Sequence, residues 1–167
     1  MRRAANIASV SWPDHLVFGE GDGRLATVDA VARRGHELAG HGYTHRRFTE
    51  LSPDELRTEL ARTRALLPAR RDRRALVRPP HGQLSLGSAV VCASAGFTLV
   101  LWSRDSGDWC TEHSRDVVRS FDEKLEPGSI VLLHEGQTWT LEALPEILTT
   151  LERQGHELCT VGELLHD

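Results

Sequence analysis

The sequence predicts an α/β domain of about six parallel strands, arranged either as an open doubly wound sheet or as an incomplete barrel. Short apolar segments alternate with segments of helical periodicity, which is typical of repeated β/α units. Arg34–Leu38 and Gln154–Leu158 are near copies, so the same turn from a helix into a strand is expected twice. No glycine-rich phosphate loop follows a predicted strand, which weakens a nucleotide-binding version of the sheet.

In the first half of the chain, apolar character and turn residues define five elements. His15–Phe18 is a short strand ended by glycine, and Leu25–Arg34 has apolar residues at helical spacing before another glycine. His36–Ala39 follows as a strand. The helix Ser52–Leu67 has the clearest start, with serine as N-cap, proline at the first helical position and glutamate at the third. Ala75–Val77 is the next strand.

The second half of the chain continues the alternation, with glycine or Pro-Gly turns after its long helices. The expected helices and strands are, in order, Ser85–Ala95, Phe97–Trp102, Ser114–Leu125, Ser129–Leu133, Thr140–Gln154, His156–Thr160 and a short helix at Gly162–Leu165.

Length and charge restrict the functional classes. The 167 residues suggest a single domain, 1–167, and the net charge of -4 gives no electrostatic support for nucleic-acid binding. No apolar run approaches the roughly 20 residues of a membrane span, and no apolar signal core follows the basic start. A cytoplasmic location is therefore the default expectation, or a secreted or cell-envelope location if the true start lies upstream. The oligomeric state is not predicted.

Chemically capable side chains follow four successive predicted strands. In parallel α/β folds, function lies just past the carboxyl ends of the strands, so we expect these residues to share one rim. They are His41 and His45, then Arg78 and His81, then Asp105, Asp108 and Trp109, and finally His134. Arg78 could be a surface arginine or a bidentate clamp on a carboxylate.

The histidines and aspartates each allow a functional and a structural interpretation. His41 and His45 are four residues apart, so in a helical turn both imidazoles could grip one metal ion. His134 ends an apolar strand and could be a general acid or a core histidine. Asp105 or Asp108 could orient His134 as its charged partner, or could form an Asx turn.

Four motifs occur in order from about Phe18 to the C-terminus. They are Gly35–His45 with Leu51–Leu56, Arg78–Gly82 (R-P-P-H-G), Trp102–Trp109 (W-x-x-D-x-x-D-W), and Ile130–Gly136 (with L-x-H) followed by Ala143–Leu148. Together they resemble the polysaccharide deacetylase family, the NodB homology domain of carbohydrate esterase family 4. The resemblance implies a distorted, N-terminally incomplete (β/α) barrel with fewer than eight strands.

The resemblance also implies a hydrolase with a metal cofactor. His41 and His45 would bind zinc or another divalent ion, which polarises the acetamide carbonyl and activates a water. The substrate would be an acetylated glycan, with N-acetylated amino sugars as in peptidoglycan or chitin, or less often O-acetylated xylan. The resemblance further implies that the backbone N–H of His81 stabilises the oxyanion. His134 would protonate the leaving amine, and Asp105 or Asp108 would tune the pKa of His134. Trp109 and Leu132 would form walls of the acetyl pocket.

One family motif, T-F-D-D-G, is absent from the sequence. In the family it supplies the catalytic base and the third metal ligand, so the first strand is expected to be missing, with a gap in the sheet and no base for Arg78 to clamp. Two histidines alone should bind metal weakly, and loss of the base typically lowers the rate ~10²- to 10⁴-fold. Smaller departures are Gly42, where the family prefers serine or threonine, and His81 for tyrosine. His81 could offer a substitute ligand.

Three hypotheses remain open at the level of sequence. The first is a deacetylase whose start is set too late or whose gene is truncated, which predicts a T-F-D-D-G strand in the upstream reading frame. The second is a non-catalytic glycan-binding relic of the same fold. The third is an unrelated α/β metal hydrolase with unrecognised carboxylate ligands, which predicts stoichiometric zinc and activity on a non-sugar amide.

Overall fold

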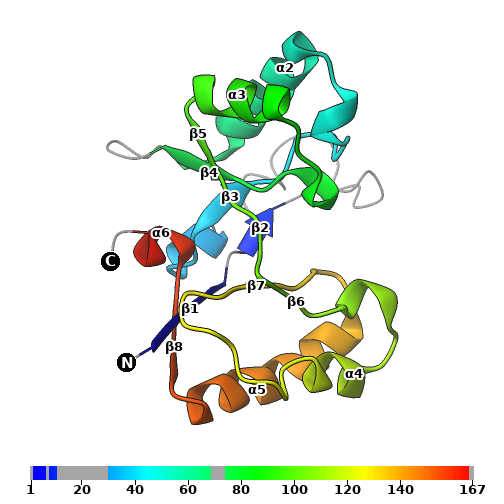
Figure 1. The fold of residues 1–167 in the computed structure, drawn as a ribbon, viewed down its shortest axis with the longest axis vertical. Helices are drawn as coiled ribbons and strands as arrows, with labels where there is room; N and C mark the ends of the chain where they lie inside the picture. The colour runs from blue at the N-terminus through cyan, green and yellow to red at the C-terminus, as the bar shows by residue number, and fades with distance from the viewer. Residues whose placement is uncertain (1, 7, 11–29, 69–73, 166–167) are drawn as a thin grey trace. The chain divides into compact units, whose positions relative to one another are not determined.

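A computed structural model describes residues 2–6, 8–10, 30–68 and 74–165 (Figure 1). The predicted strand His15–Phe18 and most of the predicted helix Leu25–Arg34 lie outside these residues, although residues 30–33 are helical. The chain forms two compact units. Unit 1 comprises Met1–Ile7 and Trp102–Asp167, and unit 2 comprises Ala8–Leu101.

Unit 2 is a four-stranded parallel sheet with the order β2-β3-β4-β5. Its strands are β2 (Ala8–Val10), β3 (Leu38–Gly40), β4 (Ala75–Val77) and β5 (Phe97–Leu99). Its helices are α2 (Pro53–Leu66) and α3 (Leu86–Ser94), with 3₁₀ turns η1 (Phe48–Glu50) and η2 (Pro80–Gly82). The helices α2 and α3 pack against each other and against the strands β3 and β5 (Figure 1).

The start of α2 follows directly from its sequence. The Ser52 hydroxyl accepts from the backbone N–H of Glu55, and the Glu55 carboxylate accepts from the backbone N–H of Ser52, which completes a capping box. The helix then buries Leu56 and Leu60 in a core that also contains Phe48, Val77 and Phe97. Fully burying one such leucine stabilises the fold by about 1.5–3 kcal/mol, so this face holds α2 on its sheet.

Unit 1 is a second four-stranded parallel sheet, with the order β6-β7-β1-β8. Its strands are β1 (Arg2–Asn6), β6 (Arg104–Asp105), β7 (Ile130–Leu132) and β8 (His156–Cys159). Its helices are α4 (Ser114–Arg119), α5 (Thr138–Arg153) and α6 (Val161–Leu164), with the 3₁₀ turn η3 (Asp108–Cys110). The helices α4 and α5 lie side by side (Figure 1), and Val117 and Phe121 pack against Ala143 and Ile147 of α5.

The described residues contain more strands and one shorter helix than the sequence predicted. Eight short strands are present among the described residues. Five of them match predicted strands, the sixth predicted strand (His15–Phe18) lies outside these residues, and β1, β2 and the two-residue β6 were not recognised. We expected a gap in the sheet, whereas β1 pairs in parallel with both β7 and β8. The helix predicted to reach Leu125 ends at Arg119. Just beyond it, the backbone N–H of Phe121 donates to the Val118 carbonyl oxygen at 2.9 Å, an i to i+3 bond that tightens the chain into a turn.

No helix among the described residues has both the length and the apolar character that a membrane crossing requires.

Candidate active site

The turn after β3 carries the first pair of expected site residues. His41 Nδ1 lies 2.8 Å from the carbonyl oxygen of Arg78, at the end of the neighbouring strand β4. A carbonyl oxygen only accepts, so Nδ1 carries the ring proton and donates it to Arg78. The lone pair of the His41 ring is therefore on Nε2. This is the tautomer that a metal-binding histidine needs, with its other nitrogen fixed by a backbone carbonyl.

Three imidazoles gather at this end of unit 2. The ring centroids of His41 and His45 are 5.0 Å apart, and those of His45 and His81 are 4.9 Å apart. His45 and His81 both have left-handed backbones, with φ of 60° and 57°. Such residues are strained by about 1–3 kcal/mol, and they concentrate at functional sites. Within the described part of the chain, no three His, Cys, Asp or Glu side chains are arranged to hold a metal ion, so the geometry does not support His81 as a third ligand.

Gly42 departs from the family pattern for a local structural reason. Its φ is +81°, and a Cβ added there would lie 3.2 Å from Cγ of Pro80 and 3.4 Å from the Phe48 ring. A serine or threonine would therefore be both strained and crowded in this turn.

A buried carboxylate beneath the turn was missed by the sequence analysis. Glu59 of α2 is only 7% exposed, and its Oε2 accepts from the backbone N–H groups of Tyr43 and Thr44 at 2.9 and 2.8 Å. The available signal was its spacing, because Glu59 lies on the same helical stripe as Leu56 and Leu60. A charged residue in an apolar stripe indicates a buried partner.

Arg78 is a core residue of unit 2. It is 1% exposed, which excludes the surface arginine that the sequence left open. Burial lowers the pKa of the Arg78 guanidinium to about 10, so it stays protonated at neutral pH. Burying a charge is costly unless the charge is paired, so the Arg78 guanidinium is expected to act on a polar or anionic group.

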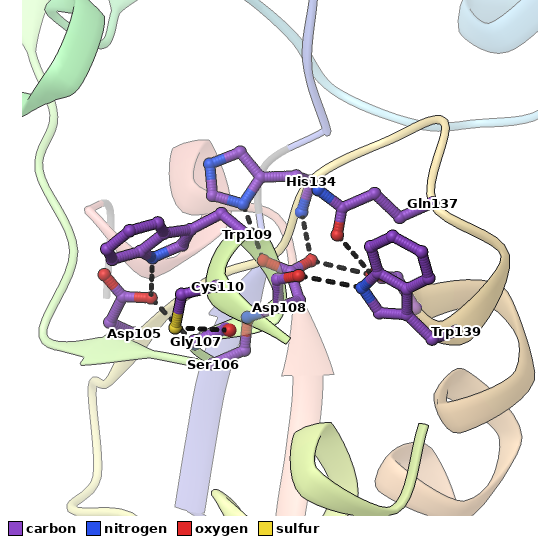
Figure 2. Close-up of polar contacts among 10 residues, drawn as sticks. Asp105, Ser106, Gly107, Asp108, Trp109, Cys110, His134, Gln137 and Trp139 are labelled. Atoms are coloured by element: carbon purple, nitrogen blue, oxygen red, sulfur yellow. Dashed lines mark hydrogen bonds and ion pairs between the residues drawn. The ribbon is translucent and has the colours of Figure 1, made fainter. Parts of the chain in front are cut away.

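In unit 1, Asp108 and His134 form a tightly bonded pair (Figure 2). Asp108 is fully buried, and its Oδ1 lies 2.6 Å from His134 Nδ1. Its Oδ2 accepts from the backbone N–H of His134 at 2.6 Å and from the Thr140 hydroxyl at 2.9 Å. Trp139 adds a bond from its indole N–H to the Asp108 carbonyl oxygen at 2.8 Å. Each carboxylate oxygen is thus bonded, and the side chain has one orientation.

The environment of Asp108 determines its charge. Burial acts to raise the pKa of this carboxyl, but the hydrogen bonds from His134 and Thr140 outweigh burial and hold the pKa below its usual range. The carboxylate is therefore ionised at neutral pH and fixes the His134 proton on Nδ1. The His134 side chain is 39% exposed, so its Nε2 can exchange protons with a bound molecule or water. This arrangement suits a general acid–base histidine.

Asp105, the other candidate partner of His134, has a different set of contacts. Its Oδ1 accepts from the backbone N–H of Gly107 at 2.9 Å, which forms an Asx turn, and from the indole N–H of Trp109 at 3.3 Å (Figure 2). Trp109 is 60% exposed and is held by this bond, whereas Leu132 is buried in β7. Thr140 and Trp139 were not predicted, because nothing in the sequence marks them apart from other residues at a helix start.

The comparisons with known proteins agree on one family. The family model for polysaccharide deacetylase matches residues 16–100. A peptidoglycan-N-acetylglucosamine deacetylase of Bacillus cereus is 31% identical over 143 residues, covering 83% of this chain and 67% of that protein. A chitooligosaccharide deacetylase of a Bradyrhizobium species is 30% identical over 155 residues, covering 82% of this chain and 70% of that protein.

A solved structure extends the agreement to the fold. It is a mutant of BA3943, a CE4 family pseudoenzyme of Bacillus anthracis, with restored enzymatic activity. It superposes with a TM-score of 0.77 at 28% identity, over 85% of this chain and 52% of that one. The predicted α/β class, with parallel strands of the barrel-forming β/α type, is thereby confirmed. The sequence match, the ordered motifs and the fold together establish that this chain belongs to the polysaccharide deacetylase family.

Proposed function

We propose that the chain is a metal-dependent deacetylase that hydrolyses the acetamide of N-acetylated amino sugars in a polysaccharide such as peptidoglycan or chitin. The observation that carries the proposal is the buried, ionised Asp108 bonded to Nδ1 of the half-exposed His134. A carboxylate that fixes the tautomer of a histidine is the usual means of preparing it for proton transfer. The substrate class follows the named activities of the B. cereus and Bradyrhizobium relatives.

His41 and His45 fit a divalent ion such as zinc. The bond from His41 Nδ1 to the Arg78 carbonyl leaves Nε2 as the ligand atom, and the His45 ring lies 5.0 Å from the His41 ring, centroid to centroid. When bound, such an ion would polarise the acetamide carbonyl and make a water more acidic. Imidazole nitrogens are ligands that zinc prefers.

The remaining roles fall to groups of this chain. His134 protonates the leaving amine from Nε2. The Asp108 carboxylate stabilises the positively charged His134 ring that donates this proton. The backbone N–H of His81 is the proposed oxyanion donor, because Pro80 has no N–H. Arg78 contributes a buried positive charge, and Trp109 offers an exposed ring face for a sugar.

The test is zinc-dependent acetate release from N-acetylglucosamine oligomers by the full chain. We expect a rate about 10²- to 10⁴-fold below that of a relative with the T-F-D-D-G carboxylates, since a general base contributes that factor. His134→Gln should abolish release, whereas His36→Gln, which changes an exposed histidine before β3, should leave it unchanged. Release that does not depend on zinc, or that survives His134→Gln, would contradict the proposal.

A second candidate is a glycan-binding protein of the same fold without catalysis. It is supported by the similarity to a mutant of the BA3943 pseudoenzyme, and by the absence, among the described residues, of a third side chain placed to hold a metal with His41 and His45. The same assay separates the two functions. Oligosaccharide binding without acetate release, measured by calorimetry at several oligomer lengths, would favour the second.

A further inference from the structure

One side chain determines the shape of the turn that joins the two proposed metal histidines. The turn runs from His41 to His45, and its two central N–H groups, those of Tyr43 and Thr44, both point at Oε2 of Glu59. Two successive backbone donors directed at one oxygen constrain the dihedral angles between them. The carboxylate therefore acts on the backbone that separates the imidazoles, without belonging to the pair itself.

Glu59 is held in place by its own helix. It is 7% exposed, and the Thr63 hydroxyl donates to its backbone carbonyl at 2.8 Å. The neighbouring Arg62 adds a second grip on the turn, because its guanidinium carbon lies 3.7 Å from the centroid of the Tyr43 ring. The helix α2 thus contacts the turn in two ways. The Glu59 carboxylate accepts hydrogen bonds from the backbone of the turn, and the Arg62 guanidinium lies over the Tyr43 ring.

We propose that Glu59 is a positioning residue for the imidazole pair, which sets the distance and direction of His45 relative to His41. This inference rests on the metal dependence proposed above. His45 occupies a left-handed backbone conformation (φ 60°) that a free chain rarely adopts, so it needs support from its surroundings. The bonds from Tyr43 and Thr44 to Glu59 provide support directly before His45 in the chain.

The expected effect on metal binding can be stated as a ratio. Groups that orient metal ligands without touching the metal typically change affinity about 10- to 100-fold when removed. Glu59→Leu removes the acceptor at similar size and should weaken zinc binding by that factor. Glu59→Gln keeps one carbonyl oxygen that can accept from the N–H groups of both Tyr43 and Thr44, so this variant should retain most of the wild-type zinc affinity.

The experiment measures zinc affinity by competition with a chromophoric chelator, together with hydrogen exchange of the Tyr43 and Thr44 amides. Glu59→Leu should weaken binding and accelerate the exchange of both amides, while Glu59→Gln should stay near the wild type in both. The matched control is Leu60→Ala, on the same helix and fully buried, which destabilises α2 without touching the turn. It should leave the zinc affinity unchanged under conditions where the protein stays folded.

Each outcome identifies what fails. If the wild type binds zinc and Glu59→Leu binds it equally well, the positioning role is overturned and the proposed function stands. If Leu60→Ala weakens zinc as much as Glu59→Leu, the effect is general destabilisation, and the positioning role is again overturned. If the wild-type chain binds no zinc, the proposed metal dependence and this inference are overturned together.

Discussion

Replacing Asp108 by asparagine tests the acid–base pair with almost no change in shape. An amide has one acceptor oxygen where the carboxylate has two. Oδ2 accepts two hydrogen bonds and Oδ1 accepts one, so the amide oxygen is expected to take the place of Oδ2. The amide NH₂ then faces His134 Nδ1, which must give up its proton and become an acceptor. The His134 proton moves to Nε2.

The size of the effect follows from the bonds that change. Asp108→Asn replaces a carboxylate that accepts three hydrogen bonds, one of them the short bond from the His134 ring, with a neutral amide in a fully buried site. A hydrogen bond to a charged group contributes about 1.5–3 kcal/mol, so we expect the free energy of unfolding at pH 7 to fall by up to that amount. The pKa of Asp108 is lower in the native state than in the unfolded state. The difference in free energy of unfolding between the wild type and Asp108→Asn is therefore complete above the ordinary aspartate pKa of about 3.9. It should disappear as the pH falls through the lower native value.

Two measurements check this prediction. Urea unfolding gives the free energy at pH 7 and at acidic pH, and long-range ¹H–¹⁵N spectra of the His134 ring report which nitrogen is protonated. Asp105→Asn is the matched control, because Asp105 lies at the end of β6, close to Asp108 in the chain, and makes no hydrogen bond to His134. An Asp108→Asn protein that is as stable as the control and still carries its proton on Nδ1 would refute the reasoning.

Three further substitutions test the packing and capping of the fold. Gly40→Ala places a Cβ 2.6 Å from Cγ2 of Thr63, so it should destabilise by about 1–3 kcal/mol in urea, and Thr63→Ser should relieve the loss by removing that methyl group. His156 is 4% exposed, and neither of its ring nitrogens has a hydrogen-bond partner among the residues that the structure describes. His156→Leu should therefore leave the melting temperature unchanged or raise it, and a large fall would show an unrecognised role. Ser85→Ala removes the N-cap of α3 and should cost about 1 kcal/mol, with Ser85→Asp near the wild type, and equal losses for both would contradict a capping role.

The alternation of strands and helices could be predicted because each element carries a local signal. Ala75–Val77 is a strand with the predicted bounds, and α2 begins at the capping box that its sequence shows. The two-residue β6 has no signal of its own, since it exists through pairing with β7. The end of α4 was misjudged for a related reason. Phe121 and Leu125 are buried at helical spacing, although the backbone there has left the helix.

The residue types of the site could also be predicted, but their partners could not. Asp105 and Asp108 are equivalent in the sequence, and only the folded loop directs one to His134 and the other to Trp109. Thr140 and Glu59 were missed because their bonds join segments far apart in the chain. The catalytic, substrate-binding and metal-binding roles of the residues remain predictions.

The position of β1 imposes an order on folding during synthesis. This strand leaves the ribosome before all of unit 2, whereas both of its sheet partners, β7 and β8, are made after it. At ~5–20 residues per second, β1 waits on the order of ten seconds with both edges exposed. Unit 2 is continuous in sequence, so all of its strands are synthesised within that interval. The completion of unit 1 is therefore the step at which we expect a nascent chain to depend on chaperones.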